Sequence, residues 1–227
     1  MRDNKPSKSN IWVVVPCYNE SATIAAVVNE IHAIVPNIVV VDDSSSDQTP
    51  DLLGKLPTKV VTNSHNLGYV RSIQSGLKYA FSHGADYAIT FDADGQHLAL
   101  DLPKLLEIIT KHHPHLIFGK RTFKNSAVEK LFSLYTQNRF GISDTFCGFK
   151  AYSQVFFKSI GGKLEHHYTI GLESIFVELE CSSPNFVEVN LTTDKRKDHP
   201  RFAGRIKGNI LELLAAINLI WYSRVSR

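Results

Sequence analysis

The chain has 227 residues, 43% of them hydrophobic, which is enough to bury one large core or two small ones. Its formal net charge of +3 is too small to indicate a nucleic-acid partner. Three cysteines, none at CxxC spacing, argue against a disulfide framework and favour a reducing cytoplasm. No apolar run reaches the roughly 18 residues of a membrane-spanning helix, and the polar start of the chain predicts no signal peptide.

The first half of the sequence alternates β-branched runs with segments of helical periodicity. The expected elements, in chain order, are strand 11–15, helix 20–35, strand 38–41, helix 49–56, strand 59–61, helix 68–81, strand 87–91, helix 102–111 and strand 115–119. This alternation of apolar strands and helices predicts an α/β fold, in which a mostly parallel sheet is covered by helices on both faces.

The second half of the sequence is less regular. We expect amphipathic helix 125–140, helix 171–180, strand 186–191 and, after a basic stretch, an apolar helix from 209 to about 224. The segment 144–152 contains a glycine between aromatic residues. The final helix has an apolar face that either covers the domain's own core or contacts a membrane or a partner protein.

Carboxylates follow two of the expected strands. Asp42 follows strand 38–41, and Asp92 and Asp94 follow strand 87–91. Ligands of parallel sheets bind beyond the carboxyl ends of the strands, so these acids should gather at one edge, beside the loop 16–20. Two carboxylates this close are costly unless a cation or water lies between them. Because Mg²⁺ and Mn²⁺ prefer oxygen ligands, the pattern indicates metal-assisted chemistry on a phosphorylated substrate.

Four motifs, in this order, resemble those of family 2 glycosyltransferases. They are Val14-Val15-Pro16-Cys17-Tyr18-Asn19-Glu20, Val40-Val41-Asp42-Asp43-Ser44-Ser45-Ser46-Asp47-Gln48-Thr49, Asn66-Leu67-Gly68 and Phe91-Asp92-Ala93-Asp94-Gly95-Gln96-His97. Gln96-His97 after the Asp-x-Asp is most similar to the dolichol-phosphate mannosyltransferase-like branch. The resemblance covers most of residues 11–160. It implies a GT-A fold, a GDP- or UDP-linked sugar donor, a divalent metal and inversion at the anomeric carbon.

The residue pattern at the two ends of the chain, together with the family resemblance of the part between them, indicates a domain organisation. We expect a flexible N-terminus at 1–10, a GT-A domain at 11–208 and a C-terminal amphipathic helix at 209–227. Within the GT-A domain, the donor half would span about 11–122 and the acceptor half about 123–208. Gly119-Lys120-Arg121, Asp144 to Lys150 and Glu188-Val189-Asn190 resemble further family elements, with Lys120 and Asn190 as departures that leave the acceptor side open.

Roles for individual residues follow from the resemblance. Asp92, Asp94 and Gln96 would hold Mg²⁺ or Mn²⁺, which offsets the charge of the departing nucleoside diphosphate. The donor nucleotide would be contacted by Pro16, Tyr18, Glu20, Asp42, Asp92, Ala93 and Arg196. Some of these side chains also have plain structural explanations: Tyr18 can simply pack, Glu20 can favour a helix N-terminus, and Asp43 with Ser44–Ser46 can form a turn.

The catalytic candidates are Asp92, Asp94, Arg121, Asp144 and Glu173. Arg121 can clamp a phosphate bidentately, while Asp144 can orient sugar hydroxyls or pair with Arg121. Glu173 is a candidate base if the acceptor is a hydroxyl. A phosphate acceptor is already anionic and needs cations to position it, and residues 195–207 supply six Lys and Arg side chains. This basic stretch either contacts a phosphate or is simply solvated.

The sequence thus predicts a metal-dependent inverting glycosyltransferase that acts on a polyprenyl phosphate, in the cytoplasm or at the cytoplasmic face of a membrane. Transfer to a saccharide hydroxyl in cell-envelope glycan synthesis and noncatalytic binding of a sugar nucleotide are the alternatives. A phosphatase is disfavoured because its Asp-x-Asp belongs on the first strand. A Rossmann dehydrogenase is disfavoured because the first strand lacks GxGxxG.

Overall fold

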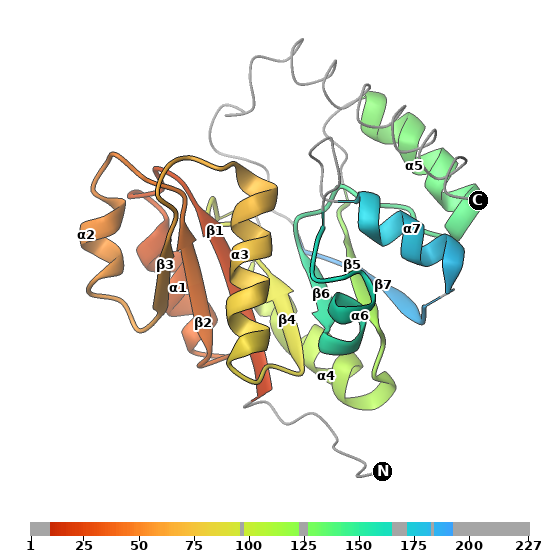
Figure 1. The fold of residues 1–227 in the computed structure, drawn as a ribbon, viewed down its shortest axis with the longest axis horizontal. Coiled ribbons are helices and arrows are strands. Elements are labelled where there is room, and N and C mark those ends of the chain that lie inside the picture. The colour runs from red at the N-terminus through yellow and green to blue at the C-terminus, as the bar shows by residue number, and fades with distance from the viewer. Residues whose placement is uncertain (1–9, 96–97, 123–126, 165–171, 183, 193–227) are drawn as a thin grey trace.

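A computed structural model describes residues 10–192 except 96–97, 123–126, 165–171 and 183. In this part of the chain, one seven-stranded sheet has the order β3-β2-β1-β4-β6-β5-β7 (Figure 1). The strands are β1 (Ile11–Cys17), β2 (Ile38–Asp42), β3 (Lys59–Thr62), β4 (Tyr87–Thr90), β5 (Leu116–Lys120), β6 (Lys150–Ser153) and β7 (Phe186–Asn190). All neighbouring strands run parallel except β6, which is antiparallel to β4 and β5.

Helices cover both faces of this sheet and enclose two apolar clusters. One cluster packs beneath α1 (Ile24–His32), α2 (Thr49–Leu53) and α4 (Leu102–His112), which follows the short 3-10 helix η2 (Ala99–Asp101). The other packs beneath α3 (Tyr69–Ser82), α5 (Ala127–Phe140), α6 (Gln154–Ser159) and α7 (Glu173–Cys181). The α/β fold with helices on both faces is therefore confirmed.

The expected strands form because β-branched runs are buried on both faces, as in other parallel sheets. Every residue of β1 and β2 is buried. The outermost strand β3 differs, since Lys59, Val60 and Thr62 are exposed. A charged, exposed and short outer strand discourages pairing with another chain.

Helix α1 begins later than expected, at Ile24 rather than at residue 20. The backbone N–H groups of Glu20 and Ser21 are used elsewhere: Glu20 N–H donates to Thr49 Oγ1 at 2.9 Å. Ser21 N–H donates to Asp47 Oδ2 at 3.2 Å. The first residues of the expected helix therefore belong to the loop after β1, which is hydrogen-bonded to the segment that follows β2.

The sequence patterns missed β6 and α6. Strand β6 has only four residues and begins with the buried Lys150. It forms because Lys150 pairs with Thr90 of β4 on one side and with Phe118 of β5 on the other. A strand this short, stabilised on both sides by distant partners, has no periodicity of its own to reveal it.

Helix α5 was expected to be amphipathic, but the face it buries is largely polar. Glu129, Ser133 and Thr136 are buried alongside Phe132, whereas Leu131 and Leu134 are 70% and 63% exposed. None of the helices in the described ranges combines the length and apolar content needed to cross a membrane. The expected helix 209–227 lies outside the described residues.

Candidate active site

The candidate site lies at the edge where the parallel strands end. Strands β1, β2, β4 and β5 deliver the loops after Cys17, Asp42, Thr90 and Lys120 to this edge. Because β6 runs the opposite way, its first residue, and hence the loop 141–149 that precedes it, lies at the same edge. The antiparallel strand thus places the loop 141–149 directly between the β4 and β5 exits.

The loops after β1 and β2 are joined by hydrogen bonds. Asn19 N–H donates to Ser45 Oγ at 2.9 Å, and Ser46 N–H donates to Asn19 Oδ1 at 2.8 Å. Asp42 is buried and accepts Ser45 N–H at Oδ1, at 3.1 Å. The serines therefore act as turn residues, the structural alternative considered for them.

The donor candidates on these loops differ in exposure. Tyr18 is 45% exposed at the tip of its loop, whereas Pro16 is buried within β1. Glu20 is buried and accepts the Thr23 hydroxyl at 3.1 Å. Tyr18 is thus the candidate whose ring remains available to pack on a base.

Asp43 organises the start of α3, a role that the sequence patterns did not separate from turn formation. Its Oδ1 accepts Asn63 Nδ2 at 2.7 Å and Leu67 N–H at 2.9 Å, and its Oδ2 accepts Gly68 N–H at 2.8 Å. Gly68 adopts φ +90°, a conformation that favours glycine. The Asn66-Leu67-Gly68 motif is therefore a loop fastened to the exit of β2.

Asp92 and Asp94 lie immediately beyond β4, with Ala93 buried between them. Asp92 Oδ1 accepts the Tyr69 hydroxyl at 2.6 Å. Burial of this hydroxyl and the neighbouring Asp92 carboxylate raise the pKa of Tyr69 well above its usual value, although 43% of the residue is exposed. Tyr69 therefore stays protonated and acts as the donor.

The carboxylates fit a cation site that substrate would complete. No group of three or more His, Cys, Asp or Glu side chains suited to a metal ion occurs among the residues that the structure describes. Mg²⁺ is usually bound by one or two carboxylates together with substrate phosphates and water. A Cβ added at Gly148 would lie 2.4 Å from Asp92 Oδ2, so only glycine leaves room for this carboxylate.

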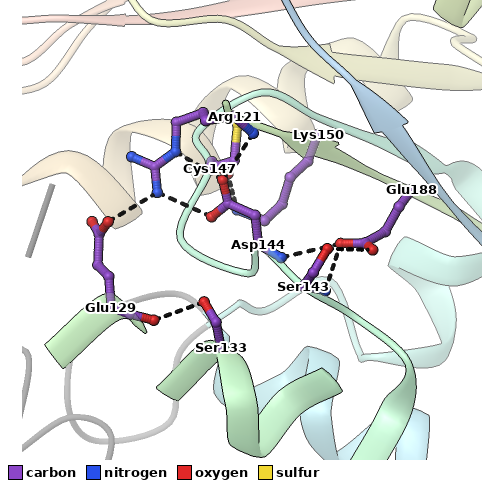
Figure 2. Close-up of polar contacts among 8 residues, drawn as sticks. All are labelled: Arg121, Glu129, Ser133, Ser143, Asp144, Cys147, Lys150 and Glu188. Carbon is purple, nitrogen blue, oxygen red and sulfur yellow. Dashed lines mark hydrogen bonds and ion pairs between the residues drawn. The ribbon is translucent and has the colours of Figure 1, made fainter. Parts of the chain in front are cut away.

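Arg121 and Asp144 form a buried two-point ion pair (Figure 2). Arg121 Nε donates to Asp144 Oδ2 at 2.9 Å and Nη2 donates to Oδ1 at 3.0 Å. Arg121 Nη2 also reaches Glu129 Oε2 at 3.3 Å. Burial by itself would raise the pKa of Asp144, but the hydrogen bonds and charge of Arg121 outweigh it and lower that pKa. Of the alternatives considered for Asp144, the structure shows the pairing with Arg121.

Glu188 of β7 fixes the turn that carries Asp144 (Figure 2). Its Oε1 accepts the backbone N–H groups of Ser143 and Asp144 at 2.7 and 3.1 Å, and its Oε2 accepts the Ser143 hydroxyl at 2.7 Å. The sequence placed Glu188 in a family element without a role. Its partners lie 44 and 45 residues away, so only the fold reveals this contact.

A small cavity of about 50 Å³ lies behind this edge, between α3 and the loop before β6. Lys150 contributes to its wall, and its ammonium group donates a hydrogen bond to the Cys147 carbonyl oxygen. Burial lowers the pKa of Lys150 and raises that of Cys147 to about 12. Burial also raises the pKa of Cys17 to about 12, so both thiols stay protonated and are poor nucleophiles.

Three of the predicted site residues have side chains outside the part of the chain that the structure describes. Gln96 and Arg196 lie outside the described residues. Glu173 begins α7, but its side chain is not among those described. The remaining candidates come from loops or strand ends that share the carboxyl edge of the sheet, where Pro16 is the last residue but one of β1.

The family model described as glycosyl transferase family 2 matches residues 12–164, which contain this edge and all of its described acids except Glu188. The chain belongs to glycosyl transferase family 2. The predicted enzyme class is therefore confirmed, and the glycosyltransferase is similar to several named relatives.

Two relatives of the glycosyltransferase are named for dolichol-linked chemistry. UDP-N-acetylglucosamine–dolichyl-phosphate N-acetylglucosaminyltransferase from Methanococcus voltae is 30% identical over 184 residues, covering 68% of this chain and 73% of that protein. Dolichol-phosphate mannosyltransferase from Pyrococcus furiosus is 33% identical over 127 residues, covering 52% of this chain and 35% of that protein. The expected resemblance to the dolichol-phosphate mannosyltransferase-like branch is confirmed.

A solved structure with the same fold is glucosyl-3-phosphoglycerate synthase from Mycobacterium tuberculosis, in complex with Mn²⁺, UDP and glucosyl-3-phosphoglycerate. The two chains superpose with a TM-score of 0.73 at 18% identity, and the match covers 91% of this chain and 78% of that one. This similarity confirms the GT-A fold.

Proposed function

We propose that this glycosyltransferase transfers a sugar, with inversion, from a nucleoside diphosphate donor to a polyprenyl phosphate, and that Mg²⁺ or Mn²⁺ is required. The observation that carries the proposal is the position of Asp92 and Asp94 directly after β4, beside the exits of β1 and β2. The Methanococcus voltae relative is named for a UDP-linked donor and a dolichyl-phosphate acceptor, which supports both substrates.

The donor would lie across the β1, β2 and β4 exits. Tyr18 would cover the base, while Asp42 would accept a hydrogen bond from the base or the ribose. Asp92 and Asp94 would hold the cation, which supplies positive charge to the leaving diphosphate. The Mn²⁺ and UDP of the Mycobacterium tuberculosis enzyme, on the same fold, support this arrangement.

In the proposed reaction, an acceptor phosphate oxygen forms a bond to the anomeric carbon from the face opposite the donor diphosphate. The bond between the anomeric carbon and the diphosphate oxygen breaks, and the nucleoside diphosphate leaves with the electron pair. The acceptor oxygen is already anionic at neutral pH, so no side chain has to remove a proton from it. The basic residues of 195–207 would help to hold the acceptor phosphate.

Charge-neutralising variants of similar shape test this proposal. Asp94→Asn should lower transfer to polyprenyl phosphate by more than about 100-fold and weaken metal-dependent nucleotide binding. Glu107→Gln removes an exposed carboxylate on α4 and should leave both unchanged. Transfer would be measured with GDP- and UDP-linked sugars, with and without chelator, and nucleotide binding by calorimetry.

Three results would contradict the proposal in different parts. Full activity of Asp94→Asn would contradict the role proposed for Asp92 and Asp94. Activity that persists in the presence of chelator would contradict the proposed requirement for a metal ion. Transfer to a saccharide hydroxyl but not to a polyprenyl phosphate would replace the acceptor and leave the donor side intact.

A further inference from the structure

One side chain that contacts Asp92 comes from a different layer of the fold. Tyr69 is the first residue of α3, on one face of the sheet, whereas Asp92 follows β4 within the sheet. The Tyr69 hydroxyl bridges the two by donating to Asp92 Oδ1 at 2.6 Å. This is the length of a charge-assisted O–H···O⁻ bond, which is about twice as strong as a neutral one.

The position of Tyr69 is itself fixed. Asp43 accepts the N–H groups of Leu67 and Gly68, the two residues before Tyr69. Ser72 N–H then donates to the Gly68 carbonyl at 3.1 Å, which closes the first turn of α3. These hydrogen bonds hold the Tyr69 backbone at the exit of β2. The side chain extends from this fixed position, and its hydroxyl reaches Asp92.

Asp92 is also confined by the close approach of Gly148. A Cβ on Gly148 would lie 2.4 Å from Asp92 Oδ2, 2.7 Å from Oδ1 and 2.6 Å from the Tyr69 hydroxyl. The carboxylate and the tyrosine hydroxyl thus both lie against the Gly148 backbone, which leaves no room for a side chain there. Neither Tyr69 nor Gly148 is among the residues to which the motifs assign a role in holding the metal.

We propose that Tyr69 is a positioning residue, which holds the Asp92 carboxylate in the orientation required to bind the cation and the donor diphosphate. The inference rests on the proposed function, because it concerns the same carboxylate. Partners that orient a metal ligand typically change metal affinity or activity by about 10- to 100-fold when they are lost.

The test compares two variants on one helix. Tyr69→Phe removes the hydroxyl and keeps the ring, while Tyr79→Phe makes the same change where the ring packs edge-on against Trp12. Free Mn²⁺ would be followed by electron paramagnetic resonance during titration, in the presence of UDP or GDP. We expect Tyr69→Phe to weaken Mn²⁺ binding by at least about 10-fold and Tyr79→Phe to leave it unchanged.

Kinetics and stability separate positioning from a structural effect. In Tyr69→Phe, the Mn²⁺ concentration for half-maximal transfer should rise, while the KM for the acceptor and the metal-free melting temperature should stay near wild type. Unchanged Mn²⁺ affinity in a folded Tyr69→Phe protein would overturn the inference and leave the proposed function standing. A wild-type protein that binds no Mn²⁺ with either nucleotide would overturn both.

A second variant covers the case in which Tyr69→Phe does not fold. Gly148→Ala keeps Tyr69 but introduces a methyl group that would crowd both Asp92 and the Tyr69 hydroxyl. We expect weaker Mn²⁺ binding in this variant too, because the same carboxylate is displaced. Wild-type Mn²⁺ affinity in Gly148→Ala would show that the orientation of Asp92 is unimportant and would overturn the inference.

Discussion

Asp144 holds Arg121 by three hydrogen bonds, because its Oδ2 accepts both the backbone N–H and Nε while its Oδ1 accepts Nη2. Both side chains are largely buried, with 13% of Arg121 and 2% of Asp144 exposed. Removing one partner of such a pair leaves a buried charge only partly compensated, here by Glu129. The pair therefore connects the β5 exit to the loop before β6.

Asp144→Asn should lower the free energy of unfolding by about 3 kcal/mol, because Arg121 stays buried without its main counter-charge. Denaturant titration would measure the loss. The matched control is Glu107→Gln, which removes the carboxylate partner of Lys111 in a pair whose side chains are 61% and 63% exposed. That variant should leave the free energy of unfolding nearly unchanged, because exposed ion pairs contribute little to stability. Equal losses in the two variants would contradict the special role of the buried pair.

The same pair makes stability depend on pH in a definite direction. Arg121 lowers the pKa of Asp144 in the folded state, so the unfolded chain binds a proton more readily. Asp144 therefore contributes its full stabilisation above the unfolded pKa of about 4 and loses it as pH falls below that value. As the pH is lowered from about 7 to about 3, the melting temperature should fall less steeply for Asp144→Asn than for wild type. Parallel decreases in the two proteins would contradict this assignment.

Asp43→Ala should destabilise the protein by at least about 2 kcal/mol, because it removes the acceptor of two backbone N–H groups and of the buried Asn63 amide. It should also weaken nucleotide binding, since the start of α3 loses its attachment to β2. Asp51→Ala, on the exposed side of α2, should change stability by less than about 0.5 kcal/mol. Thermal unfolding and nucleotide titration of both variants would check this difference.

Gly76→Ala should destabilise the protein by about 1 to 3 kcal/mol, although alanine favours helices. Gly76 lies on α3, where a Cβ would approach Val14 Cγ1 to 2.2 Å and Val41 Cγ2 to 3.0 Å. Gly54→Ala is the control, since its Cβ would meet nothing closer than 3.8 Å and its backbone has φ −62°. That control should be neutral or stabilising by up to about 1 kcal/mol, and a stabilised Gly76→Ala would contradict the tight contact between α3 and the sheet.

Glu173→Gln distinguishes the two acceptor classes. Transfer to a phosphate needs no base, so the variant should keep activity within about threefold of wild type, whereas transfer to a hydroxyl should fall about 100-fold or more. Glu178→Gln, on the same helix α7, controls for loss of a carboxylate. Steady-state rates with a polyprenyl phosphate and with a saccharide would be compared. A large loss with the phosphate acceptor would contradict the mechanism proposed for it.

The central strands could be predicted from the sequence because strands buried on both faces consist of continuous apolar runs. Val13, Val39 and Ile89 are almost completely buried, as their neighbours are. Strand β6 escaped prediction because Lys150 opens it and its stability comes from Thr90 and Phe118, which are distant in the sequence. Local periodicity reports burial but cannot report which strands pair.

Some residues of the candidate site could likewise be predicted from the sequence, and others could not. Asp42, Asp92 and Asp94 could be placed at one edge because each follows a recognisable strand. Tyr69 and Glu188 could not be assigned, since their partners lie 23 and up to 45 residues away. Each had one available signal: Tyr69 directly follows the Asn66-Leu67-Gly68 motif, and Glu188 occupies a family element.

The placement of β6 between β4 and β5 constrains the order in which the chain folds as it leaves the ribosome. Strands β1 to β4 pair only among themselves, apart from the contact of β4 with β6, so they can assemble early. Strand β5 is synthesised next but, within the part of the chain that the structure describes, pairs only with β6 and β7. It therefore stays without a partner strand until about 30 more residues have been synthesised, and an unpaired apolar strand is prone to aggregate during that interval.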